Sequence, residues 1–126
     1  MLGNSKFCKK YLCANAGLYT FYNESENYPY GICNLKKYNI RIKKSLEKEV
    51  YILAGEKDIN TKLLNSLPKD IEEGMNRYDR ALNYFASAKK YAEKYNIKFN
   101  WNFISMPKGH HNFKEVIPFA IKVINN

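Results

Sequence analysis

Cysteine and arginine are scarce in this sequence, and each scarcity argues against a class of function. The three cysteines, Cys8, Cys13 and Cys33, are odd in number and lack Cys-x-x-Cys spacing, unlike a disulfide framework or a zinc site. Only three of the 21 basic residues are arginine, and the lysines are spread along the whole chain. A specific nucleic-acid site is therefore not expected, despite the net charge of +9. No metal and no cofactor is expected.

Long hydrophobic runs are also missing. No apolar stretch approaches the ~18 residues of a membrane span, and the N-terminus has no signal-peptide apolar segment. We therefore expect a reduced, cytoplasmic protein with no membrane association. At 126 residues, with 45% hydrophobic and 15% aromatic residues, the chain can form the packed core of a single domain covering residues 1–126.

Apolar patterning predicts strands that alternate with helices. Residues 11–17, 49–54 and 99–106 are short apolar stretches typical of buried strands, and the second is continuous enough for burial on both faces. Residues 77–96 repeat apolar side chains at three- and four-residue steps, and residues 113–124 do so over a shorter span. This order predicts an α/β fold with about three parallel strands and flanking helices.

Three connecting segments are less clear. Residues 18–31 form a loop dense in aromatic side chains, which is either the wall of a pocket or packed against the body of the protein. Residues 35–46 are lysine-rich and fit a short helix or a connection. Residues 60–74 fit a polar loop with one or two short helical turns, because Pro68 interrupts them.

Two polar residues follow two successive strands of the predicted sheet. Asp58 comes after the 49–54 strand and a glycine turn, and His110 comes after the 99–106 strand, Pro107 and Gly109. In a parallel sheet both strand ends lie on one edge, ~5 Å apart, so Asp58 can accept a hydrogen bond from the imidazole. The alternative is that Asp58 caps a helix and His110 is an ordinary turn residue.

Six short motifs extend this interpretation beyond the two strand ends. Together they resemble the C-terminal half of a serine α/β-hydrolase of the esterase and lipase-like superfamily, over roughly residues 7–125. The motifs are Ala14-Asn15-Ala16-Gly17-Leu18-Tyr19-Thr20, Tyr28-Pro29-Tyr30-Gly31, Gly55-Glu56-Lys57-Asp58, Gly74-Met75-Asn76-Arg77 with Arg80, Phe99-Asn100-Trp101 and Pro107-Lys108-Gly109-His110.

The resemblance implies a partial α/β-hydrolase fold in which the N-terminal half of the sheet is absent. It implies that Asp58 is the acid and His110 the base of a catalytic triad. It also implies that Leu18 and Tyr19, at the start of the aromatic loop, contact an acyl substrate. His111 stands where the family has an aspartate, and we expect it to support the site or to face solvent.

The nucleophile that such a triad needs is missing from the sequence. Ser5 follows Gly3, but no strand precedes it and Phe7 stands where a nucleophile elbow has glycine. Cys8 and Cys13 lie before and within the first strand, away from its carboxyl end. We therefore expect a chain that is inactive alone and acts on a small acyl substrate only when an N-terminal half completes it. The open edge of the 11–17 strand predicts self-association.

Two other functions are compatible with the sequence. One is a non-catalytic α/β binding module derived from a hydrolase, which predicts a stable fold without a nucleophile. The other is a basic protein associated with nucleic acid, which depends on the net charge alone and predicts a steep salt dependence of binding.

Overall fold

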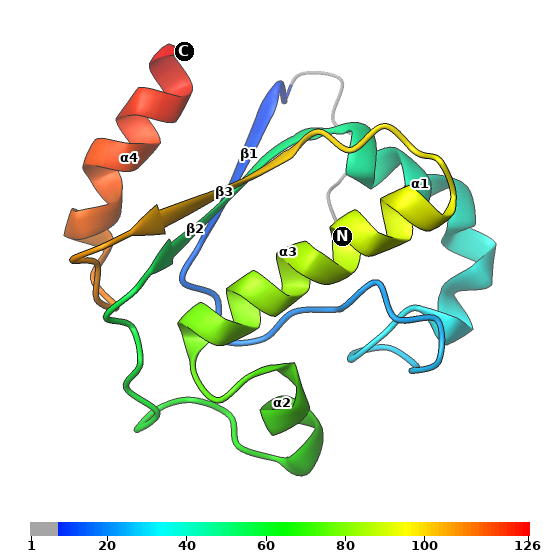
Figure 1. Ribbon diagram of the computed structural model, residues 1–126, viewed down its shortest axis with the longest axis horizontal. Coiled ribbons are helices and arrows are strands. Elements are labelled where there is room, and N and C mark those ends of the chain that lie inside the picture. The colour runs from blue at the N-terminus through cyan, green and yellow to red at the C-terminus, as the bar shows by residue number, and fades with distance from the viewer. Residues whose placement is uncertain (1–7) are drawn as a thin grey trace.

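A computed structural model describes residues 8–126, in which three strands form one sheet (Figure 1). The strands are β1 (Lys10–Ala14), β2 (Glu49–Gly55) and β3 (Trp101–Met106), in the order β1-β2-β3 with both pairs parallel. Helix α3 (Arg77–Lys94) packs against β2 and β3, and α4 (Phe113–Asn125) contacts β1. Figure 1 shows the strands running between these two helices. The α/β fold and its parallel sheet are confirmed.

Strand β2 occupies the centre of the sheet, which explains its continuous apolar run. Val50 is in register with Tyr11 on one side and with Trp101 on the other. Ile52, Leu53 and Ala54 are almost completely buried. A central strand that is covered on both faces needs apolar side chains at successive positions, and residues 50–54 supply them.

The connecting segments contain three further elements. Residues 35–46, which the sequence leaves ambiguous, are mostly helical: a 3₁₀ helix η1 (Cys33–Tyr38) leads directly into α1 (Asn39–Glu47). Residues 60–74 contain one short helix, α2 (Pro68–Glu73), which begins at the proline, where a missing N–H costs nothing. Residues 18–31 form neither helix nor strand, as predicted.

The aromatic loop 18–31 both packs against the body of the protein and lines a hollow. The Tyr19 ring stacks on Tyr84 of α3 with a centroid separation of 4.5 Å, and the Tyr22 ring meets Trp101 edge-on at 5.6 Å. Leu18 and Tyr19 also line a hollow of about 280 Å³ together with Trp101. The loop is therefore both packed against the body of the protein and part of the wall of a hollow.

Helix α4 and the neighbouring β1 leave apolar side chains exposed. Val123 is the buried side chain of α4, whereas Phe113 and Ile124 are 72% and 66% exposed. Leu12 of β1 is also partly exposed, and β1 is an edge strand of the described sheet. Self-association through this edge stays a prediction. Among the helices of residues 8–126, none combines the length and the apolarity needed to cross a membrane. Ser5 lies outside the described residues.

Candidate functional site

The acid turn after β2 buries Asp58 completely. The backbone N–H of Asp58 donates to the Gly55 carbonyl at 3.0 Å, which closes a tight turn and directs the side chain inward. No part of the carboxylate side chain is exposed. The Arg77 guanidinium lies 3.7 Å from Oδ1, and no hydrogen bond reaches this oxygen from the described residues. The other oxygen, Oδ2, is available to a partner from the histidine turn.

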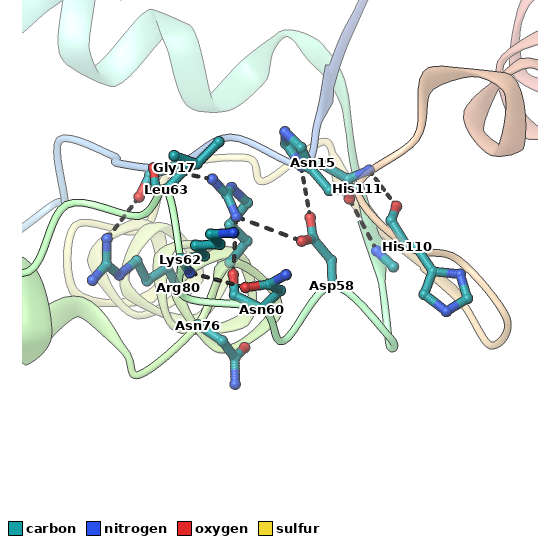
Figure 2. A network of polar contacts seen from close by, with 12 residues as sticks. Asn15, Gly17, Asp58, Asn60, Lys62, Leu63, Asn76, Arg80, His110 and His111 are labelled. Atoms are coloured by element: carbon teal, nitrogen blue, oxygen red, sulfur yellow. Dashed lines mark hydrogen bonds and ion pairs between the residues drawn. The ribbon is translucent and has the colours of Figure 1, made fainter.

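That partner is His111, and it corrects the sequence prediction that Asp58 pairs with His110. His111 Nδ1 lies 3.0 Å from Asp58 Oδ2. The His110 ring points away from Asp58 (Figure 2), and its Nδ1 lies 3.3 Å from Glu115 Oε1. The backbone N–H of His110 also donates to Glu115, in the first turn of α4. Because Glu115 holds His110 on the outside of the turn, the next residue faces the buried carboxylate.

Main-chain hydrogen bonds bring the acid turn and the histidine turn together. The Lys57 N–H donates to the Gly109 carbonyl at 2.9 Å, and the Glu56 N–H donates to the Met106 carbonyl at 3.0 Å. A Cβ atom on Gly55 would lie 2.3 Å from the Gly109 carbonyl oxygen, far inside van der Waals contact. The close approach of the acid turn and the histidine turn therefore requires glycine at position 55.

Asn15 ties the end of β1 to the same edge. Its Oδ1 accepts the Gly55 N–H at 3.1 Å, and its Nδ2 donates to the His110 carbonyl at 3.3 Å (Figure 2). The Asn15 backbone has a φ of 48°, in the left-handed region that asparagine tolerates better than most residues. The ends of all three described strands are thus connected around the site.

The hollow beside His111 is separate from the one that the sequence predicts for substrate. His111 lines a hollow of about 350 Å³ between β1 and α4, together with Asn15, Phe113 and Ile117. Leu18 and Tyr19 line the 280 Å³ hollow instead, and the two hollows share no lining residue. Leu18 is 38% exposed and Tyr19 is buried. A substrate-binding role for these two residues stays a prediction.

The Asp58–His111 contact is suited to acid–base chemistry. A carboxylate that accepts a hydrogen bond from Nδ1–H fixes this tautomer and leaves Nε2 free to take a proton. The His111 side chain is 56% exposed, so a reacting group can reach it. Burial raises the pKa of the Cys13 thiol, which disfavours the thiolate needed for attack. Within residues 8–126, no three His, Cys, Asp or Glu side chains form a group able to hold a metal ion.

Comparison with known proteins identifies related folds among solved structures. Poly(aspartic acid) hydrolase-1 from Sphingomonas sp. KT-1 is similar with a TM-score of 0.83 and 29% identity, over 91% of this chain and 44% of that one. LpqC, a poly(3-hydroxybutyrate) depolymerase from Bordetella parapertussis, has a TM-score of 0.82 and 24% identity, over 93% of this chain and 42% of that one. The chain has the α/β fold of these hydrolases. It spans less than half of their length. No family model and no curated protein matches it.

Two buried charged residues support the segment that follows β1. Arg80 belongs to one of the six motifs, but that motif indicates no contact for it, and nothing in the sequence indicates the role of Glu73. Arg80 is 1% exposed and donates to the carbonyls of Gly17, Asn65 and Gly74, each at 2.8 or 2.9 Å. Glu73 is 4% exposed, and its Oε2 accepts the Tyr19 N–H at 3.2 Å. Both side chains hold the backbone of residues 17–19 in place.

Because the pKa of Glu73 is raised in the folded protein, this residue makes the fold less stable as pH rises. Burial raises the pKa of Glu73 from its ordinary 4.5 to about 7, although the Tyr19 N–H and the Arg80 charge act to lower it. Between these two pH values the folded protein holds a proton that the unfolded chain releases. The free energy of unfolding therefore falls as pH rises through this window, by at most about 1.4 kcal/mol per pH unit, and is level above it.

We expect Glu73→Gln to remove this slope and to stabilise the protein at pH 8, because glutamine keeps an acceptor for the Tyr19 N–H without the buried charge. Urea unfolding at pH 5 and pH 8 measures the effect. Glu72→Gln, at an exposed neighbouring position, is the matched control and should leave the slope unchanged. An unchanged slope in Glu73→Gln would contradict the assignment.

The sequence did not predict the contacts of His111 with Asp58, of Glu115 with His110 and of Arg77 with Asp58, although a signal existed for Glu115. Asn112 and Glu115 have the spacing of a helix N-terminus, with Asn112 Oδ1 accepting the Lys114 N–H. That spacing predicts that Glu115 reaches back along the chain, and here it reaches His110. Nothing in the sequence indicates the contact of Arg77 with Asp58, because they lie 19 positions apart on a loop and a helix start.

Proposed function

We propose that this chain carries the acid–base part of a hydrolase site that cleaves acyl esters or amides. The observation that supports it best is the 3.0 Å contact between His111 Nδ1 and a completely buried carboxylate, at the carboxyl edge of a parallel sheet. This edge is where open α/β folds place their ligands and reacting groups. The polymers in the names of the two similar structures contain amide and ester bonds respectively, which favours acyl transfer as the reaction class.

In the proposed mechanism, Asp58 orients His111 and stabilises its protonated form. His111 Nε2 takes the proton of a serine hydroxyl while that oxygen attacks the substrate carbonyl. The same nitrogen then returns the proton to the leaving alcohol or amine, and water repeats the sequence to release the acid. Because the sequence contains no Gly-x-Ser-x-Gly, the serine and its oxyanion donors would come from another polypeptide segment, one that pairs with the β1 edge.

The experiment is complementation with a matched pair of histidine variants. The full chain is mixed with a separate polypeptide that carries a Gly-x-Ser-x-Gly strand–turn–helix, such as the part of the poly(aspartic acid) hydrolase that this chain does not match. Hydrolysis of p-nitrophenyl acetate is then measured. We expect no rate above background from the chain alone. In the mixture we expect His111→Gln to lower the rate by about 10³-fold or more. His110→Gln should change it by less than about threefold, because this ring lies outside the pair.

Each outcome of this experiment discriminates between the two histidines. A rate that survives His111→Gln but is lost in His110→Gln would restore His110 as the base. A rate that survives both substitutions would exclude the proposed mechanism.

A non-catalytic binding module is the second candidate. The absence of Gly-x-Ser-x-Gly from the sequence favours it. It predicts that the chain and the added polypeptide form no hydrolase, and that the chain alone gives cooperative unfolding and stays monomeric at high concentration.

A further inference from the structure

One oxygen of Asp58 has a charge partner but no hydrogen-bond donor. Oδ2 faces His111, whereas Oδ1 is buried and without a hydrogen bond from residues 8–126. The ion pairs of Asp58 in this part of the chain are those with His111 and with Arg77, whose Nη1 lies 3.7 Å from Oδ1. When the His111 imidazole is neutral it carries no charge. Arg77 is then the cation that lies beside the Asp58 carboxylate, which has no exposed surface.

The guanidinium is held at this position from the other side. Arg77 is the first residue of α3, which Asn76 caps by accepting the Asp79 N–H. Arg77 Nη1 donates to the Asn60 carbonyl at 3.2 Å, and Nη2 donates to the Leu63 carbonyl at 3.5 Å. The side chain is only 11% exposed. The loop after Asp58 thus fixes the cation that faces Asp58, and the cation does not have to be ordered when substrate arrives.

We propose that Arg77 is a positioning residue: its fixed cation balances the buried Asp58 carboxylate, so that Asp58 holds the His111 proton on Nδ1 and Nε2 is left unprotonated for the reacting group. This inference rests on the proposed function, because it concerns the same pair. Burying a carboxylate without a cation is strongly unfavourable. Without Arg77, no permanent cation lies beside the buried Asp58 carboxylate. Its hold on the Nδ1 proton of His111 then weakens, and the His111 tautomers become mixed.

The test reads the tautomer directly in the full chain. Imidazole ¹⁵N spectra are recorded at a pH at which both rings are neutral, and His110 serves as an internal reference because it is the only other histidine. We expect His111 to be mainly Nδ1–H in the unaltered chain. In Arg77→Gln this population should fall below about half while the His110 signals stay unchanged. Arg77→Lys, which keeps the charge, should restore most of it. Arg41→Gln removes an exposed arginine from α1 and should have no effect.

A second measurement needs no substitution, in case Arg77→Gln fails to fold. The Asp58 ¹³Cγ resonance of the unaltered chain distinguishes an ionised from a protonated carboxyl group. The proposal requires the ionised shift while His111 is neutral, and a protonated shift overturns it.

Asp58→Asn separates failure of this inference from failure of the proposed function. If Asp58→Asn changes the His111 tautomer and a folded Arg77→Gln does not, the role of Arg77 is wrong and the pair stands. If Asp58→Asn also leaves the tautomer unchanged, the pair itself is absent and the proposed function fails with it.

Discussion

Replacing Arg80 by methionine is expected to lower the free energy of unfolding by about 3–5 kcal/mol. The side chain is 1% exposed and donates three hydrogen bonds to backbone carbonyls. Methionine fills much of the volume but donates nothing, so the carbonyls of Gly17, Asn65 and Gly74 lose their donor in a region with little access for water. A small domain has only about 5–15 kcal/mol of stability in total, so a large fraction of it would be lost.

Chemical denaturation followed by circular dichroism measures this loss. The control is Arg41→Met, which removes the same positive charge from an exposed position and should change stability by less than about 0.5 kcal/mol. Arg80→Lys should fall between the two, because an ammonium on a flexible stem cannot reach three diverging carbonyls as a planar guanidinium does. Equal stability of Arg80→Met and Arg41→Met would show that the three contacts contribute little.

Gly55→Ala is expected to separate the acid turn from the histidine turn. The new methyl group would lie 2.3 Å from the Gly109 carbonyl oxygen, and backbone on both sides prevents a local side-chain adjustment. We expect a destabilisation of about 3 kcal/mol, as found for overpacked sites, together with loss of the His111 tautomer signature in whatever fraction stays folded.

Gly17→Ala provides the matched control for this substitution. Among the described residues, a methyl group at position 17 would meet Leu64 Cδ1 alone, at an ordinary 3.7 Å. Its effect on stability should be within about 0.5 kcal/mol, or slightly favourable through reduced freedom of the unfolded chain. If alanine at position 55 is as harmless as alanine at position 17, the two turns are not in the close contact described.

The sequence predicts the framework of this fold well, because the framework depends on local patterns. The run from Val50 to Ala54 is typical of a covered strand, and the three- and four-residue steps from Tyr78 to Tyr95 specify α3 within two residues of its end. The segment at 35–46 was ambiguous because its helix buries few apolar side chains, Ile42 and Leu46 among them, between lysines. Helix α2 agrees with the short helical turns expected in residues 60–74. Its start is local, at Pro68, and a tertiary contact from the Tyr30 hydroxyl to Asp70 supports it further.

The candidate site was predictable only to the level of its turns. A glycine turn after a buried strand placed Asp58 at the correct edge, and Pro107 and Gly109 placed a histidine opposite it. Which of two adjacent histidines faces inward depends on backbone torsions of the turn, which sequence composition does not specify. Here Glu115 determines the choice by binding His110, and this contact needs the start of α4 to be known to within one residue.

The links between the acid turn and the histidine turn are largely main-chain hydrogen bonds, and this has a consequence for sequence variation. The distance from Asp58 to His111 does not depend on the chemistry of the side chains at positions 57 and 108, both of which are exposed lysines. The side chains at positions 57 and 108 can therefore change in charge or size without moving Asp58 relative to His111. A lineage, or a designed library, could retune the electrostatic field met by an incoming molecule while the reacting geometry stays constant.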